Sequence, residues 1–306
     1  MEIKGILVTS LAPFEDHMAN CGEKLLGNAS SIKRRPDGRV YVSGQMQRHV
    51  LFSAIDRLNQ CDPNKKETFV SNGDGVSNQI ENDIRADLGG FMHPSKGDYS
   101  GRRTAPLSVT PAVALKESEI GRDLLTRVKM SSASGTNDQA LATREYSEHD
   151  VMLMNFFLDV SSVGVTKTFE YEGGFNINAN YIKHISDEEK LRRINMFIEA
   201  TKLMNDYANQ ARNAVCGEPQ QVLIVFDTAL SRKAIRYFSA GEIERKNILK
   251  ELNNRGAKYF LGDDTKEGES VSDAYANALA FLRSSENCLC DLAGDVEPVA
   301  FGKVFK

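Results

Sequence analysis

Several segments of the chain carry apolar residues in the alternating or continuous pattern that is typical of β-strands. Ile3 to Leu11 alternates and is rich in β-forming residues, so we predict that it is the first strand of a sheet. Val151 to Val160 is the most apolar segment, and Gln221 to Leu230 resembles it, which indicates two buried strands. Pro106 to Leu115 is expected to be extended, and Val163 to Phe169 is expected to pair with or neighbour the strand at 151–160.

Other segments repeat their apolar residues with the period of an amphipathic helix. Ser43 is a suitable N-cap for a helix whose apolar stripe runs from Val50 to Leu58. Ser186 and Glu189 predict a capping box at the start of a long helix, with a buried face that reaches Tyr207. We also predict helices at 76–88, 240–254 and 271–284, a glycine cap at Gly90, and a loop over 170–180.

These elements alternate without an internal repeat, a low-complexity tract or an evident interdomain linker. The 306 residues suffice for one large domain or two ordinary ones. We therefore predict a single α+β domain over 1–306, with insertions at about 12–42, 62–104 and 124–147.

One insertion is strongly basic, although the net charge of the whole chain is -4. Residues 27–49 contain Lys33, Arg34, Arg35, Arg39 and Arg48 against the single acid Asp37. The Pro36-Asp37-Gly38 triplet is a turn signal, and it places the basic residues on an exposed loop. A strand at Tyr41 and Val42 then leads to the helix that Ser43 caps.

A helix N-terminus beside basic residues is a favourable place for a phosphate, because its free N–H groups and its dipole attract anions. Gln45 and His49 lie four residues apart, on the face of this helix that is opposite its apolar stripe. The segment is therefore a candidate for binding a nucleic-acid backbone. The alternative is a solvated charged loop in front of an ordinary core helix.

Two further segments carry possible nucleic-acid contacts. Arg102 and Arg103 follow a loop rich in glycine and proline, where they could also be solvated arginines before an edge strand. Leu124 to Ser147 reads as a β-hairpin with a small polar tip. Met130 beside that tip is either incidental or an apolar wedge between bases. The charged residues expected to line the arms of the hairpin are Arg127, Lys129 and Arg144.

Signals for other chemistry are weak. The five cysteines are odd in number and scattered, which argues against a disulfide framework or a zinc site. The sequence lacks the common nucleotide-binding, zinc-protease and nucleophile motifs, so we expect no catalytic residue, no metal and no cofactor. No apolar run reaches the length of a membrane span and the N-terminal stretch is unlike a signal peptide, so a cytoplasmic protein without a membrane partner is expected.

The order of these blocks resembles CRISPR-associated family seven in its DevR-type branch, the repeated backbone subunit of type I CRISPR effector complexes (Cascade). The resemblance extends from the first strand to about residue 170, and it is only loose in the last third of the chain. The segments that carry it are GILVTSLAP, CGEKLLGNASSIKRRPDGRVYVSGQMQRHVLFSAI, DLGGFM, GRRTAPLSVTPAVAL and DVSSVGV.

The resemblance implies a palm related to the RNA-recognition motif (ferredoxin-like), with inserted fingers and a thumb-like β-hairpin at 124–147. It also implies that several copies assemble side by side on one CRISPR RNA, together with other Cascade subunits. These copies would hold the sugar-phosphate backbone and leave the bases free to pair with target DNA. The residues expected to contact the guide are Asn28, Lys33, Arg34, Arg35, Arg39, Gln45, Arg48, His49, Arg102 and Arg103.

Two alternatives remain open. Backbone subunits of the related type III complexes cleave target RNA with a loop aspartate, and Asp37 lies in the corresponding region, although a role in its turn also explains it. The second alternative is a small-molecule enzyme of α+β fold with an incidental basic loop.

Overall fold

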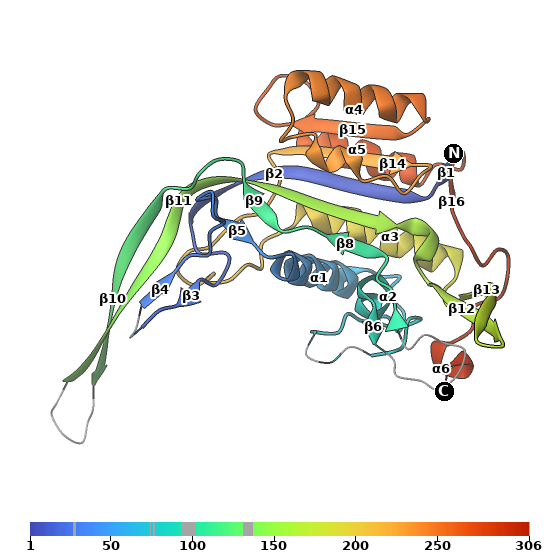
Figure 1. Ribbon diagram of the computed structural model, residues 1–306, viewed down its shortest axis with the longest axis horizontal. Helices are drawn as coiled ribbons and strands as arrows, with labels where there is room; N and C mark the ends of the chain where they lie inside the picture. The colour runs from blue at the N-terminus through green and yellow to red at the C-terminus, as the bar shows by residue number, and fades with distance from the viewer. Residues whose placement is uncertain (27–28, 74, 76, 93–101, 131–136, 306) are drawn as a thin grey trace.

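The protein is built on a sheet with helices on both of its faces (Figure 1). The computed structural model describes residues 1–26, 29–73, 75, 77–92, 102–130 and 137–305, and at 102, 127–130 and 137–140 it describes the backbone only. The strands are β1 (Glu2–Ile3), β2 (Gly5–His17), β3 (Glu23–Lys24), β4 (Ala29–Ser31), β5 (Tyr41–Val42), β6 (Phe91–Met92), β7 (Arg102–Arg103), β8 (Leu107–Val109), β9 (Ala112–Ala114), β10 (Ile120–Met130), β11 (Asn137–Asp159), β12 (Val165–Glu172), β13 (Phe175–Lys183), β14 (Gln221–Asp227), β15 (Lys258–Asp263) and β16 (Cys288–Leu289). The helices are α1 (Gly44–Cys61), α2 (Ile84–Gly89), α3 (Asp187–Lys202), α4 (Glu242–Asn254), α5 (Val271–Leu282) and α6 (Phe301–Val304), with short 3₁₀ helices η1 (Val160–Ser162) and η2 (Lys233–Arg236).

The central elements follow the order strand, helix, strand, strand, helix, strand. Along the chain they are β2, α1, β8 with β9, β11, α3 and β14. Across the sheet, β14 pairs with β2, β2 with β11, and β11 with β8 and β9, and every one of these pairs is antiparallel. This is the arrangement of a ferredoxin-like split βαβ unit. The predicted α+β fold class is therefore confirmed, and the strand order agrees with the implied palm.

Alternate side chains of β2 enter two separate buried clusters, as the two-residue period of a strand requires. Ile6 and Val8 belong to the cluster with α1, α3 and α5. Leu7 and Leu11 belong to the cluster with η2 and α4. Figure 1 shows α1 and α3 on one side of β2 and β11, and α4 on the other. Because both faces are covered, β2 and β14 are nearly continuous apolar runs.

The strand β11 is 23 residues long and extends beyond the body of the protein. Its C-terminal part pairs with β2, and its N-terminal part pairs with β10 from Ile120 opposite Ser147 to Met130 opposite Asn137. The two strands form the long arm in Figure 1. The hairpin predicted at 124–147 is confirmed, although its first strand begins earlier, and its tip at 131–136 lies outside the described residues. Likewise β2 continues to His17, past the expected start of the first insertion.

Three predictions of local structure were wrong. The helix expected at 76–88 is only α2, because Asp83 is its N-cap and its side chain accepts a hydrogen bond from the N–H of Arg85 at 3.0 Å. The same carboxylate also accepts from the N–H of Ser71 at 3.2 Å. The loop expected at 170–180 is the hairpin β12–β13, because Gly173 and Gly174 adopt φ of +58° and +86°, as a two-residue hairpin turn needs. The segment 163–169 was expected to pair with or neighbour the strand at 151–160. It forms most of β12, which pairs with β13 across that turn and not with β11.

The ends of the predicted helices are partly confirmed. Ser186 caps α3 by accepting a hydrogen bond from the N–H of Glu189 at 3.3 Å. The reciprocal half of the expected capping box is missing, because the Glu189 carboxylate pairs with Arg192 and Arg193. Gly90 follows α2 with φ of +67° and ψ of 165°, a positive φ but not a left-handed helical residue. No helix in the described ranges is both long enough and apolar enough to cross a membrane.

Asp87 of α2 is fully buried and joins three parts of the chain. Its carboxylate accepts hydrogen bonds from Arg103 at 2.5 Å, from Arg193 at 2.8 Å and from the N–H of Gly164 at 2.9 Å. Burial raises the pKa of Asp87, but the charges of Arg103 and Arg193 outweigh it, and the pKa lies below its ordinary value. The ionised carboxylate therefore ties α2, β7 and α3 together.

The variant Asp87→Asn leaves Arg103 and Arg193 without this charge in the interior. We expect the free energy of unfolding at pH 7 to fall by about 3–5 kcal/mol in urea unfolding. The folded-state pKa of Asp87 is depressed, so its contribution is complete above the ordinary value near 3.8 and is lost as the pH falls through the folded-state pKa. The variant should thus lose less stability than the wild type on acidification below about pH 4.

Glu242→Gln is the matched control, since it makes the same chemical change in an exposed pair with Lys246 on α4. Its unfolding free energy should fall by less than about 1 kcal/mol, the combined effect of an exposed pair and of a charge at a helix N-terminus. Equal stability of Asp87→Asn and Glu242→Gln would contradict the role given to Asp87.

Candidate nucleic-acid interface

The basic loop has the backbone of a small hairpin. Arg34 and Val40 form an antiparallel bridge. The N–H of Arg35 donates to the carbonyl of Arg39 at 2.9 Å, and the N–H of Gly38 donates to the carbonyl of Arg35 at 3.0 Å. Gly38 has φ of +79°, which confirms the predicted turn at Pro36-Asp37-Gly38. The basic side chains are therefore carried on a hydrogen-bonded turn.

Within this turn, the carboxylate of Asp37 forms an ion pair with Arg39. Its carboxylate accepts hydrogen bonds from Nε of Arg39 at 2.7 Å and from the backbone N–H of Arg39 at 3.3 Å. The side-chain hydrogen bond from Arg39 is the main cause that lowers the pKa of Asp37. Because these two charges offset each other, the positive charge of the loop comes from Lys33, Arg34 and Arg35.

Those three cations differ in how they are held. Lys33 and Arg35 are half-buried and form no ion pair with any residue in the described part of the chain. Arg34 is exposed, and its Nη2 lies 3.6 Å from Oε2 of Glu145. A ligand carrying negative charge would find all three on one short segment.

Glu145 of β11 joins this loop to the long hairpin. It is buried, and besides Arg34 it accepts a hydrogen bond from the N–H of Ile32 at 3.3 Å. Its other oxygen lies 3.0 Å from Nη2 of Arg122 on β10. The strand β4 also pairs with β11, with Ala29 opposite Thr143. Two insertions that the sequence analysis treated separately thus meet at the base of the hairpin, where Figure 1 shows β3 and β4 beside it.

A second group of predicted residues lines a cleft at the start of α1. The hydroxyl of Ser43 accepts a hydrogen bond from the N–H of Met46 at 3.2 Å, which confirms the predicted N-cap. Gln45, Arg48 and His49 line a cleft of about 870 Å³ in volume. The other residues around it are Gly44, Asn72, Gly73, Arg85, Leu107 and Val109.

Two contacts hold the side chain of Arg48 in this cleft. Its Nη2 donates to the carbonyl of Gly89 at 2.6 Å, and its guanidinium lies 5.6 Å from the ring centre of Phe52. Burial lowers the pKa of Arg48, but an arginine remains charged in proteins at neutral pH. His49 is exposed and lies 3.9 Å from Asp206. The cleft therefore offers a fixed positive charge beside a helix N-terminus.

Arg103, a predicted contact, lies in the interior. It donates to Asp87 and to the carbonyls of Ser162 and Val165, and its side chain is 3% exposed. We therefore leave Arg103 out of the interface. Asn28 lies outside the described residues, as do the side chains of Arg102, Arg127, Lys129 and Met130. Arg144 is half-buried on β11, opposite Asp123.

The structure adds two arginines that the sequence analysis missed. Arg122 has a 72% exposed side chain beside Arg34 and Glu145, two residues before the expected start of the hairpin. Carrying the strand alternation back by two residues would have found it. Arg85 lines the cleft with Arg48, and its guanidinium lies 4.7 Å from the ring centre of Phe52. Nothing in its local sequence indicated that position.

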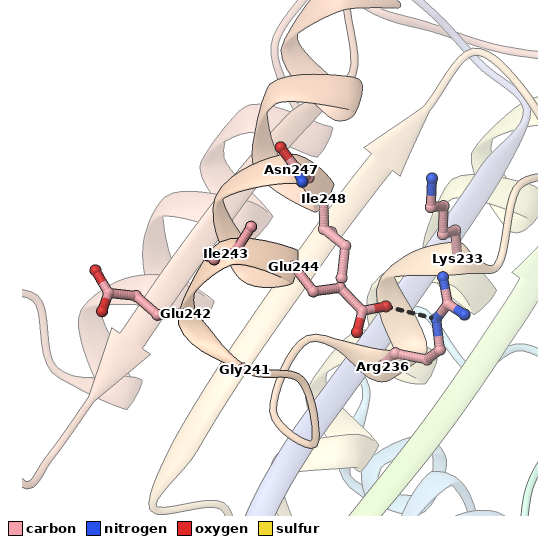
Figure 2. A pocket seen from close by; sticks show the side chains of 8 residues that line it. All are labelled: Lys233, Arg236, Gly241, Glu242, Ile243, Glu244, Asn247 and Ile248. Atoms are coloured by element: carbon pink, nitrogen blue, oxygen red, sulfur yellow. Dashed lines mark ion pairs between the residues drawn. The ribbon is translucent and has the colours of Figure 1, made fainter.

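Another concavity lies by η2 and the start of α4, on the sheet face away from α1 (Figure 2). It has a volume of about 720 Å³ and is lined by both signs of charge. Figure 2 shows Arg236 turned toward Glu244, at a distance of 3.2 Å. Glu242 and Glu244 also occupy the first turn of α4, where acidic side chains complement the helix dipole. The site therefore has no excess of positive charge for a phosphate.

Within the described ranges, no cluster of three or more histidine, cysteine, aspartate or glutamate side chains is arranged to hold a metal ion. Asp37 in particular has Arg39 as its partner.

Comparisons with known proteins agree with this picture of the fold. Two chains from solved structures, described as "CRISPR RNA-guided surveillance complex" and "CRISPR RNA-guided surveillance complex, pre-nicking", each align with a TM-score of 0.52. Their identities are 12% and 9%, over 90% and 91% of this chain and 99% of each of theirs. At such low identity the likeness shows a shared fold. A comparison with curated proteins gives no match.

The sequence profile of one family also matches. The family is described as "CRISPR-associated negative auto-regulator DevR/Csa2", and the match covers residues 26–216. This range contains the basic loop, the α1 cleft and the long hairpin. Since the match covers more than half of the chain, the protein belongs to the CRISPR-associated DevR/Csa2 family.

Proposed function

We propose that the protein is a non-catalytic subunit of a type I Cascade complex that binds CRISPR RNA and polymerises along it. It would hold the sugar-phosphate backbone and leave the bases free to pair with target DNA. The observation that carries the proposal is the cluster of cations at the base of the β10–β11 hairpin, in a chain of the DevR/Csa2 family. The similar chains come from complexes described as guided by CRISPR RNA.

The chemistry of the cations suits a phosphate backbone. A subunit that accepts any guide sequence must bind phosphates and avoid the base edges. Lys33 and Arg35 have no ion-pair partner in the described part of the chain, so their charges are available. Arg48 presents a fixed guanidinium at the start of α1, and guanidinium groups bind phosphate oxygens in a fork. The remaining proposed contacts are Asn28, Arg34, Arg39, Gln45, His49, Arg85, Arg102 and Arg122.

The hairpin is the proposed thumb. It extends from the body, so it can reach a neighbouring copy or the RNA held by that copy. Arg127, Lys129 and Arg144 are the charged positions that we assign to it, with Met130 beside the tip. The segments 12–42 and 62–104 would be the finger-like insertions of the same domain.

The cleaving alternative requires a free aspartate. Asp37 is held by Arg39 through its side chain and backbone, as a turn residue would be. We therefore do not propose cleavage. A metal-dependent RNA cleavage that Asp37→Ala abolished would reverse this choice. The small-molecule enzyme is likewise not proposed, because the cations of the basic loop and of the α1 cleft suit a phosphate backbone.

The triple variant Lys33→Ala, Arg34→Ala, Arg35→Ala tests the basic loop. Binding to the protein's own repeat-spacer RNA, and to an unrelated RNA of equal length, should weaken by about 10- to 100-fold in a filter or anisotropy assay. The slope of log affinity against log salt should become shallower by about 2, because three phosphate contacts are lost on a single strand.

Arg236→Ala, Lys246→Ala, Lys266→Ala is the charge-matched control, and all three side chains are more than half exposed. If this control weakens binding as much as the loop variant does, the effect is one of net charge. If wild type binds neither RNA, or if the loop variant binds as the wild type does, the proposed function is wrong.

A second pair of variants tests the α1 cleft. Arg48→Ala should lower the salt slope by about 0.7, the effect of a single phosphate contact. Arg57→Ala is the control on the same helix, because Arg57 donates to Asn205 at 2.7 Å and lies outside the cleft. Its salt slope should equal that of the wild type. Equal salt slopes for the wild type, Arg48→Ala and Arg57→Ala would show that Arg48 does not contact a phosphate.

A further inference from the structure

A buried asparagine closes the base of the basic loop. Asn20 is 6% exposed, and its side-chain NH₂ donates to the carbonyls of Lys33 at 2.9 Å and Tyr41 at 3.0 Å. Its Oδ1 accepts from the N–H groups of Gly22 at 3.0 Å and Lys33 at 3.5 Å. Every hydrogen-bonding position of a carboxamide is thus used. Lys33 and Tyr41 mark the two ends of the loop, so one side chain clamps both.

The loop depends on such a clamp. Between Lys33 and Tyr41 the chain has one bridge, Arg34 with Val40, and the turn at 35–38. A two-stranded hairpin of this size is marginal by itself in water. Its own cations also repel one another, which favours opening. The fixed separation of its ends therefore has to come from outside the loop. At the Tyr41 end β5 pairs with β9, and Asn20 links the Lys33 end to it.

Asn20 is itself anchored to the palm. Its neighbour Met18 accepts a hydrogen bond from Asn209 at 2.9 Å. His17, at the end of β2, contacts Asp150 of β11 at 2.7 Å, and both side chains are buried. The other oxygen of Asp150 accepts from the hydroxyl of Ser118 at 2.5 Å, and that hydroxyl accepts from the N–H of Val40 at 3.0 Å. The loop is thus tied to β11 on both sides of its turn.

We propose that Asn20 is a positioning residue for RNA binding. It touches no RNA itself, but it fixes the backbone at Lys33 and Tyr41 and so preorganises the cations between them. The inference rests on the proposed function of the loop. Preorganised side chains lose less conformational entropy when they bind, so the clamp raises the affinity for RNA without adding a contact.

This role differs measurably from that of the cations. If Asn20 is replaced, Lys33, Arg34 and Arg35 are still present and still neutralise the same phosphates in the complex. The affinity should fall while the salt slope stays that of the wild type. In the free protein, the amides of 33–41 should exchange their hydrogens faster, while β2 and β11 keep their protection.

The experiment compares Asn20→Ala with the wild type, the Lys33/Arg34/Arg35 alanine triple variant and Asn287→Ala. Asn287 is the matched control, since its NH₂ also donates to a backbone carbonyl, that of Phe281 at 2.7 Å, away from the loop. With repeat-spacer RNA as the probe, Asn20→Ala should bind about 5- to 50-fold more weakly, with an unchanged salt slope. Asn287→Ala should bind as the wild type does. Asn20→Ser keeps a single hydroxyl and should lie between Asn20→Ala and the wild type.

Several outcomes would overturn the proposal. One is wild-type affinity and wild-type exchange at 33–41 in Asn20→Ala, while the triple variant binds poorly. Another is a salt slope reduced as in the triple variant, which would mean that the loop no longer reaches the RNA. Failure of both Asn20→Ala and Asn20→Ser to fold would assign Asn20 to the stability of the whole domain. If the triple variant binds normally, the proposed function fails, whatever the exchange data for Asn20 show.

Discussion

The pairing register of β11 is the constraint on which both the core and the interface depend. Met152, Met154 and Phe156 enter the cluster with α1 and α3, while Phe157 enters the cluster with α4. A slip of one residue would exchange these faces, so packing on both sides of the sheet fixes the register. The hairpin and the core share this one uninterrupted strand. The positions of Glu145 and Asp150, which hold the basic loop, are therefore set by the apolar residues further along β11.

A network of buried and half-buried charges performs a similar task for the described part of the segment 62–104. Two adjacent arginines of α3 donate hydrogen bonds to residues of this segment. Arg192 donates to Asp62 at 2.9 Å and to Thr68 at 2.7 Å, and Arg193 donates to Asp87 and to the carbonyls of Ile80 and Glu81. Replacing buried ion pairs with apolar side chains is often neutral, but removing one partner is costly. The network therefore fixes the positions of residues 62–68 and 80–87, and Arg85 within that part lines the α1 cleft.

The charges of the protein are divided between these two uses. Arg103 and Arg193 share the Asp87 carboxylate in the interior, Arg193 also pairs with Glu189, and Arg39 pairs with Asp37 on the surface. Lys33 and Arg35 have no such partner in the described part of the chain. An acidic chain can thus present a basic surface, because its acidic side chains form ion pairs elsewhere or lie in the first turns of helices such as α3.

The sequence by itself determined what is local. Alternation located β2, a continuous apolar run located β14, the helical period located α1 and α4, and Ser43 and Pro36-Asp37-Gly38 marked a cap and a turn through chemistry within a few residues. It did not distinguish Arg103 from Lys33, although Arg103 is buried and Lys33 is half-buried with no ion-pair partner in the described part of the chain. Nor did it show that β4 pairs with β11, or that Asn20 bonds to both ends of the loop. Those outcomes depend on which segments distant in sequence share a surface, and only the tertiary structure decides that, because burial and hydrogen bonding are satisfied across the whole fold at once.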